Sequence, residues 1–284
     1  MTTPGAVRSH PLLDVDRVGG PLEAYLRGVG EVFVTIRGHD SNNTSYGVAV
    51  ADERWFVKHG EDPEAVRLLE SAIRFHRAVR HRAIIPLRGS IRTERGLAVV
   101  HEWRDGEALN DPRAPGGLPR ERPDSAHSRF RALPAPEVVA VVDVILDAHL
   151  EVARRGFVAV DFYDGALLYD FAGHRVHLCD LDAYRPGPYV LDRDRQYGST
   201  RFMAPEEFER GATIDERTTV LTLGRTAFVF LSDGPRGETG RELWRAGPEL
   251  HRVALRAVSA DRNERFASVA DLAAAWRAAP LTTR

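Results

Sequence analysis

The residues best suited to chemistry in this chain are a single lysine and a group of aspartates. Lys58 is the only lysine among 39 basic residues, so every other one is an arginine. A lysine presents a compact, titratable ammonium and an arginine a wide planar fork, so a lone lysine suggests a position that the fork does not fit. Five aspartates lie close together later in the sequence: Asp161, Asp164, Asp170, Asp180 and Asp182. Because like charges at this density repel one another unless a cation neutralises some of them, the group predicts a metal site.

A small lobe made mostly of strands must carry Lys58. Alternating and apolar patterns indicate antiparallel strands joined by hairpins, and Lys58 ends the third of them. The expected elements are strands at 31–37, 48–50, 54–58, 84–87 and 97–100 and a helix at 63–80. We assign 1–30 to an N-terminal extension and 31–103 to this N-lobe. The polar stretch from Gly38 to Gly47 is expected to be the loop between its first two strands.

A larger, mainly helical lobe over 104–284 must carry the aspartates. Residues 110–136 are rich in proline, glycine and arginine and are expected to form an inserted loop. Short apolar runs at 166–169 and 176–179 are each followed by an aspartate. Helical spacing is found at 136–154, 215–232, 248–259 and 268–278. The sequence therefore predicts an α+β protein with two unequal lobes.

Composition excludes several classes of protein. The chain is 43% hydrophobic and 28% charged, with a formal net charge of −2, so no overall field draws it to nucleic acid or to an anionic membrane. No stretch approaches the roughly 20 apolar residues of a membrane span, and the N-terminus lacks the pattern of a signal peptide. The single cysteine, Cys179, rules out an intramolecular disulfide. We expect a cytoplasmic protein that binds neither nucleic acid nor membrane.

Four features follow one another in a fixed order. Lys58 ends a strand, Asp161 follows a helix, and Asp180 follows a short strand. The segment Gly198-Ser-Thr-Arg-Phe-Met-Ala-Pro-Glu206 begins 18 residues after Asp180. This arrangement resembles the eukaryotic-type protein kinase family, in its bacterial serine/threonine branch, over about residues 31–278. The resemblance implies a bilobal kinase-like fold, with a small antiparallel-β N-lobe holding one main helix and a larger, mostly helical C-lobe.

The same resemblance implies phosphoryl transfer from ATP, with Mg²⁺ or Mn²⁺, to serine or threonine hydroxyls of a protein or peptide. Such transfer depends mainly on positioning and charge neutralisation. Lys58 would hold the α- and β-phosphates, and Asp180 would hold the metal ion that bridges phosphate oxygens. Asp161 would orient the attacking hydroxyl and accept its proton.

Residues around Lys58 acquire roles from the resemblance as well. The backbone carbonyl of Glu102 and the backbone N–H of Arg104 would bind adenine. Glu70 would pair with Lys58, and Glu64 is the alternative partner.

Structural positions in the larger lobe both match the family and depart from it. Glu206 would form a buried ion pair with Arg265, which holds the lobe together, since removal of one partner leaves an unpaired charge. Thr219 stands where the family has an aspartate that braces the catalytic loop. Val160 stands where the family has an arginine, so activation by a phosphorylated residue that pairs with this arginine is not expected.

Two departures concern the nucleotide itself. Between Gly38 and Gly47 the chain lacks Gly-x-Gly-x-x-Gly, so serine, asparagine and threonine side chains would have to donate to phosphate. Ala166 stands where the family has an asparagine that binds the second metal, and Asp164 or Asp170 would be the substitute.

Three hypotheses remain open on the sequence. The first is an ATP- and Mg²⁺-dependent serine/threonine protein kinase. The second is a catalytically weak or inactive pseudokinase that binds a nucleotide or a partner, as Ala166, Thr219 and the altered glycine loop suggest. The third is a kinase-like small-molecule phosphotransferase whose inserted loop forms an acceptor pocket. The sequence identifies neither the acceptor nor a regulatory partner.

Overall fold

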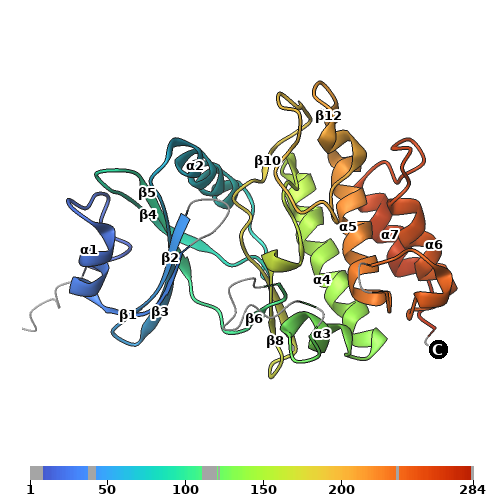
Figure 1. The fold of residues 1–284 in the computed structure, drawn as a ribbon, viewed down its shortest axis with the longest axis horizontal. Helices are drawn as coiled ribbons and strands as arrows, with labels where there is room; N and C mark the ends of the chain where they lie inside the picture. The colour runs from blue at the N-terminus through green and yellow to red at the C-terminus, as the bar shows by residue number, and fades with distance from the viewer. Residues whose placement is uncertain (1–8, 38–42, 111–119, 121, 235–236, 283–284) are drawn as a thin grey trace, which may run out of the picture. The chain divides into compact units, whose positions relative to one another are not determined.

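The computed structural model describes residues 9–37, 43–110, 120, 122–234 and 237–282 and has a mixed α+β fold. The chain divides into two compact units. Unit 1 consists of Met1–Arg77 and Ile85–Arg104, and unit 2 consists of Ala78–Ile84 and Asp105–Arg284. In Figure 1 the strands of unit 1 are blue to teal and the helices of unit 2 are green to red. The predicted α+β class is confirmed.

Unit 1 is built on a five-stranded antiparallel sheet with Lys58 in its central strand. The strand order is β1-β2-β3-β5-β4. Successive side chains of a strand point to opposite faces, so Val100 packs with Leu26 on one face and Val99 packs with Leu69 on the other. The bounds are β1 (Glu31–Ile36), β2 (Asn43–Val50), β3 (Glu53–Gly60), β4 (Leu87–Arg92), β5 (Leu97–Glu102), α1 (Leu22–Val29) and α2 (Pro63–Ala78).

Three boundaries in unit 1 differ from the sequence-based expectation. The described part of 1–30 is not separate from the sheet, because Leu12, Leu22 and Leu26 belong to its buried core. The strand expected at 84–87 begins only at Leu87, after a proline that has no N–H to donate to a ladder. The loop expected over 38–47 is shorter, since β2 already starts at Asn43.

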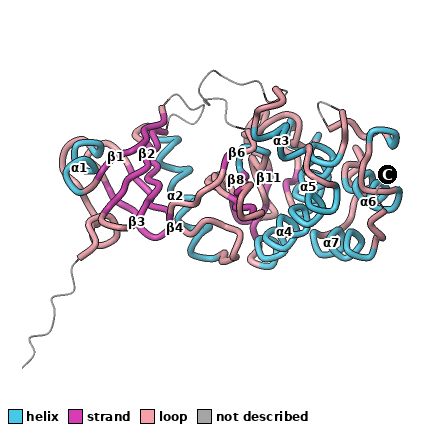
Figure 2. The backbone as a smooth tube through the Cα atoms, turned by 90° about the horizontal axis from the view of Figure 1, so that it is seen from below, coloured by secondary structure: helices cyan, strands magenta, loops and turns pink. Residues whose placement is uncertain are grey.

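Helices make up most of the regular secondary structure in the described part of unit 2. Helix α5 is buried over almost its whole length, and its sequence has only three charged residues, Glu216, Arg217 and Arg225. It contacts α4, α6 and α7, and Figure 2 shows these helices in cyan. The bounds are α3 (Ala126–Arg131), α4 (Ala135–Arg154), α5 (Glu216–Leu231), α6 (Pro248–Ala257) and α7 (Val269–Ala278). In the described part of the chain, none of the helices combines the length and apolar character that a bilayer span needs.

Short strands and 3₁₀ turns connect these helices, and the aspartates lie in them or in the loops between them. A three-stranded sheet has the order β6-β8-β9, and two further pairs join β7 to β10 and β11 to β12. The stretch expected as an inserted loop, 110–136, contains α3 and the start of α4, while 111–119 and 121 lie outside the described residues. The bounds are β6 (Glu107–Ala108), β7 (Phe157–Val158), η1 (Asp164–Ala166), β8 (Leu167–Asp170), β9 (Arg175–Leu178), β10 (Arg185–Pro186), β11 (Tyr189–Val190), η2 (Pro205–Phe208), β12 (Thr213–Ile214) and η3 (Arg241–Leu243).

Candidate active site

Asp161 and Asp180 both stand on left-handed backbone. Asp161 follows β7 and Asp180 follows β9, and their φ angles are 57° and 55°. Among the described residues other than glycine, only Ala51 and His174 share a positive φ. Such backbone is uncommon for a non-glycine residue, and strained positions persist where the surroundings fix them, often at functional sites. The two turns therefore hold both carboxylates in defined places.

Tyr163 connects the two turns within unit 2. Its hydroxyl donates a long hydrogen bond to Asp180 Oδ2, at 3.5 Å. Backbone pairing adds to this contact, since the N–H of Cys179 donates to the carbonyl oxygen of Ala166 at 2.9 Å. Asp161 is half-buried and Asp180 is exposed. The structure thus brings the predicted base and the predicted metal ligand to neighbouring turns.

The segment that begins at Gly198 lies against Asp161. A Cβ atom on Gly198 would lie 3.7 Å from Asp161 Oδ1, and the φ of Gly198 is 142°, so glycine fits this place best. The segment and the aspartate line a small cavity of about 10 Å³. Its lining residues are Asp161, Phe162, Gly198, Ser199, Phe202, Met203, Glu207 and Thr222. Ser199 and the candidate base Asp161 therefore line the same cavity.

Glu207 is a buried acidic residue that also lines this cavity. Its Oε2 accepts a hydrogen bond from the N–H of Ala204 at 2.7 Å. Burial raises the pKa of Glu207 to about 7; the Ala204 hydrogen bond opposes the rise, and the charges of Glu206 and Asp161 add to it. Near neutral pH this carboxyl can therefore exchange a proton.

Thr219 contacts the loop that carries Asp161. The N–H of Ala159 donates to Thr219 Oγ1 at 3.1 Å, and Thr219 is buried on α5. A neutral hydroxyl group thus binds the backbone of this loop.

Asp164 has a different environment from the one expected of a metal ligand. Its side chain is fully buried, and its two oxygens accept hydrogen bonds from Arg201 at 2.6 Å and from Arg120 at 3.2 Å. Burial raises the pKa of the Asp164 carboxyl, and the two guanidinium groups oppose this rise. Two arginines already neutralise the carboxylate, so we no longer assign Asp164 to a metal.

Asp170 is likewise held by its own turn. Its Oδ1 accepts from the N–H groups of Ala172 and Gly173, and its Oδ2 accepts from Arg175 at 3.0 Å. The backbone hydrogen bond from Gly173 is the largest cause that lowers the pKa of Asp170. This is the arrangement of a turn cap.

Glu206 and Arg265 form a bidentate ion pair. Arg265 Nη1 donates to Glu206 Oε1 at 2.7 Å, and Nη2 donates to Oε2 at 3.0 Å. The Arg265 side chain is completely buried, and the Thr218 hydroxyl donates to the same Oε1. Burial acts to raise the pKa of Glu206, but the hydrogen bonds outweigh it and the net pKa is lowered. The pair therefore joins the end of the 198–206 segment to the loop before α7.

Lys58 lies in unit 1, in the middle of the sheet. It is 8% exposed and stands opposite Ser45 of β2 and Val99 of β5. Glu70 is half-buried on α2, whereas Glu64 is exposed in the first turn of that helix.

Gly47 has a structural explanation in the same sheet. It is buried within β2, and a Cβ atom there would lie 2.5 Å from the Phe33 ring and 2.6 Å from Val34 Cγ1. Its position in the strand corrects the expectation that it borders a phosphate-binding loop, because the side chains of β1 already occupy the space beside it. Gly38 lies outside the described residues.

Glu102 ends β5 and Arg104 follows it. The Glu102 carboxylate pairs with Arg88 and Arg104, and its N–H donates to the carbonyl oxygen of Pro86 at 3.2 Å. The N–H of Trp103 donates to the backbone carbonyl oxygen of Arg54 at 3.0 Å, which extends the pairing between β3 and β5.

The aspartates do not form one cluster. Within the described ranges, no three His, Cys, Asp or Glu side chains gather into a group that could ligate a metal. The short spacing of the aspartates in the sequence therefore does not bring their carboxylates together, because those of Asp164 and Asp170 bind arginine side chains instead. Magnesium at nucleotide sites is usually held by one or two carboxylates together with substrate phosphates. The exposed Asp180 carboxylate fits that mode of binding.

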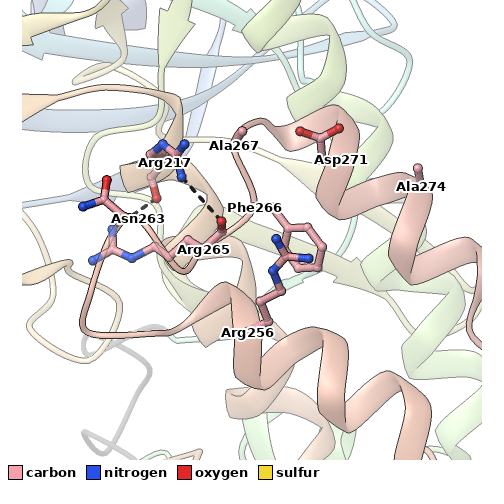
Figure 3. Close-up of a pocket in the computed structure, with 8 residues that line it drawn as sticks. All are labelled: Arg217, Arg256, Asn263, Arg265, Phe266, Ala267, Asp271 and Ala274. Carbon is pink, nitrogen blue, oxygen red and sulfur yellow. Dashed lines mark hydrogen bonds between the residues drawn. The ribbon is translucent and has the colours of Figure 1, made fainter.

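The larger of the cavities lies elsewhere in unit 2. It has a volume of about 430 Å³ and opens beside the loop that contains Arg265 (Figure 3). The Arg256 guanidinium covers the Phe266 ring there at 4.3 Å, and Arg217 donates to the carbonyl oxygen of Arg265 at 3.4 Å. Its lining residues are Arg217, Arg256, Asn263, Arg265, Phe266, Ala267, Asp271 and Ala274. None of the predicted catalytic aspartates contributes to it.

Sequence reasoning missed four contributors to the site: Tyr163, Glu207, Arg120 and Arg201. Tyr163 and Glu207 stand beside predicted site residues in the sequence, and this adjacency was the available signal. Arg120 reaches Asp164 across 44 positions, and no local pattern marks such a contact.

A comparison with models of known protein families finds no match, and no curated protein matches the sequence.

Proposed function

We propose that this chain is a kinase-like phosphotransferase, with the bilobal fold of protein kinases, that phosphorylates serine or threonine hydroxyls of a protein or peptide. ATP and Mg²⁺, or Mn²⁺, would be its substrate and metal. The observation that carries the proposal is the position of Asp161, whose turn contacts that of Asp180 and whose carboxylate faces the Gly198 segment. This arrangement supports transfer to a hydroxyl that docks on that segment.

Each residue has one task in the proposed reaction. A bond forms between the acceptor oxygen and the γ-phosphorus while the bond from that phosphorus to the β-phosphate oxygen breaks, and ADP leaves. Asp161 accepts the proton of the acceptor hydroxyl. Asp180 supplies carboxylate oxygens for the metal, and Lys58 supplies positive charge for the α- and β-phosphates.

One observation favours the alternative of a weak or silent pseudokinase. The two nearest substitutes for the second metal ligand are occupied, since Asp164 is paired with arginines and Asp170 caps its turn. Ala166 is fully buried and offers no ligand atom in its side chain. A chain with a single metal carboxylate would bind nucleotide but transfer phosphate slowly.

Thermal unfolding with nucleotides separates binding from catalysis. The wild type would be measured with ATP, ADP and GTP, each with and without Mg²⁺ or Mn²⁺, beside Lys58→Met and Asp180→Asn. A ligand at 100 times its Kd stabilises the native state by about 2.7 kcal/mol. We expect a metal-dependent rise in Tm with ATP that both variants lose. Asp192→Asn is the matched control, because Asp192 is an exposed aspartate between Asp180 and Gly198 that forms a long ion pair with Arg193, at 3.7 Å.

Radiolabelled transfer from ATP to the chain and to a mixed peptide pool then tests catalysis. Transfer that Asp161→Asn abolishes while nucleotide binding persists would support the kinase. Binding without single-turnover transfer would favour the pseudokinase. No Tm shift with any nucleotide would refute the kinase and would leave a pseudokinase that binds a partner.

A further inference from the structure

Asp164 lies where the candidate catalytic loop meets the 198–206 segment. Its carboxylate is fully buried and bonds to Arg201 at 2.6 Å, and the Arg201 side chain is only 17% exposed. Hydrogen bonds between two charged groups are about twice as strong as neutral ones. Removing one member of a buried pair leaves an uncompensated charge and is strongly destabilising. This contact is therefore a strong connection between the loop and the segment.

Arg201 is fixed from two further sides. Arg225 on α5 donates from Nε to the carbonyl oxygen of Arg201 at 2.9 Å. The guanidinium carbon of Arg201 lies 5.2 Å from the centroid of the Phe202 ring. The pair with Asp164 consequently loses little conformational entropy when it forms, because the backbone of Arg201 is already held.

The stretch between Asp180 and Gly198 is also ordered by neutral contacts. Its strands β10 and β11 pair with β7 and β12. Gln196 donates from Nε2 to the Tyr189 hydroxyl at 2.7 Å, and its N–H donates to the Glu207 carbonyl oxygen at 2.8 Å. None of these contacts requires a phosphate group.

We propose that Asp164 and Arg201 form a permanent clamp that holds the 198–206 segment against the candidate catalytic loop without phosphorylation. The proposal rests on the proposed function, since it makes Asp164 and Arg201 positioning residues for the transfer. Here the segment supplies the cation and the loop supplies the anion. A phosphate on the exposed Thr200 would compete with Asp164 for Arg201, so it would not activate the enzyme.

The unmodified chain provides the first test. Hydrogen exchange of peptides that cover 198–206, and phosphate transfer to a peptide pool, would be measured before and after phosphatase treatment, with intact mass to confirm dephosphorylation. We expect both rates to stay within about twofold. A tenfold rise in exchange or a tenfold loss of transfer after treatment would overturn the clamp.

Variants provide the second test. Arg201→Gln and Asp164→Asn should each raise the rate of hydrogen exchange in 198–206 by at least about tenfold. Each should also lower kcat by a larger factor than that by which it changes the KM for ATP. Arg201→Lys, which keeps the charge, should restore part of both. The double variant should add little to Asp164→Asn alone, because Arg201→Gln removes one of the two arginine contacts that Asp164→Asn already removes. Arg210→Gln is the control, since Arg210 pairs with an exposed Asp194.

The outcomes separate this inference from the proposed function. If Asp164→Asn fails to fold, Arg201→Gln still tests the clamp, because Asp164 keeps Arg120. Wild-type exchange in both single variants would reject the clamp even if transfer is found. Faster exchange in the variants of a chain that never transfers phosphate would keep the clamp as a structural link, but would reject its role in transfer together with the kinase.

Discussion

Thr219 on α5 accepts a hydrogen bond from the backbone N–H of Ala159 at 3.1 Å, two residues before Asp161. The contact joins the most buried helix of unit 2 to the candidate catalytic loop. A hydroxyl is a weaker acceptor than a carboxylate but avoids burying a charge. The loop is therefore braced by a neutral group.

Replacing Thr219 with the isosteric valine should leave the Ala159 N–H unpaired. The expected loss is about 1–3 kcal/mol of unfolding free energy, the cost of a buried donor without a partner. Urea unfolding measures it. Thr226→Val is the control on the same helix, because its hydroxyl only donates to the carbonyl oxygen of Thr222. Equal losses in both variants would contradict the bracing role.

Arg265→Met should be among the most damaging substitutions in unit 2. It leaves the buried Glu206 without its bidentate partner, and the expected cost is about 3–5 kcal/mol. Arg277→Met removes a half-exposed pair with Asp147 and should cost no more than about 1 kcal/mol. Denaturant midpoints of the two variants compare them, and a cost of under 1 kcal/mol for Arg265→Met would refute the prediction.

Stability should fall as the pH drops from about 6.5 to 4, in part because of His149. This side chain is fully buried. Its Nε2 lies 2.8 Å from the Tyr184 hydroxyl and its Nδ1 lies 2.8 Å from the Ile145 carbonyl oxygen. Burial lowers the pKa of His149 to about 4. The unfolded chain therefore takes up the proton first as the pH falls, so the folded state loses on the order of 3 kcal/mol across this window.

The variant His149→Gln isolates that contribution. Unfolding free energies of the wild type and of the variant, measured between pH 4 and 7, should show a shallower slope for the variant. Burial lowers the pKa of His127 to about 3. This second histidine should therefore keep part of the pH dependence of the unfolding free energy in both proteins. Parallel slopes would show that His149 does not titrate as described.

Gly47→Ala should destabilise unit 1 rather than act on nucleotide binding alone. The new methyl group would overlap Phe33 and Val34, and overpacking of this kind costs about 1–3 kcal/mol. Gly28→Ala is the control, since no atom lies within 4 Å of a Cβ at this helical position and the change should stabilise the helix by up to about 1 kcal/mol. An unchanged Tm for Gly47→Ala would restore a role for Gly47 in the loop.

Much of the fold could be predicted because its signals are local. The five helices expected at 63–80, 136–154, 215–232, 248–259 and 268–278 are confirmed within a few residues. Helix α1 was missed because only Leu22 and Leu26 of its eight residues are buried, which is too short a pattern to register. Helix α3 was missed because it lies within the arginine- and proline-rich stretch and is capped by a single serine, Ser125.

The candidate site likewise has one part that could be predicted and one part that could not. Glu206 and Arg265 were expected to pair from the resemblance to the kinase family, and their side chains do meet. The surroundings of Asp164 could not be predicted, because Arg120 and Arg201 approach it from distant segments. The spacing in the sequence shows that the aspartates are close along the chain. It does not show which arginines the fold brings into contact with them.

The left-handed turns at Asp161 and Asp180 have a consequence for the evolution of such a chain. Asparagine tolerates this backbone about as well as aspartate does, whereas most other side chains do not. A single Asp→Asn exchange at either turn would remove the carboxylate while leaving the turn intact. An active ancestor could therefore become a silent descendant, or the reverse, in one step that natural selection for folding would not oppose.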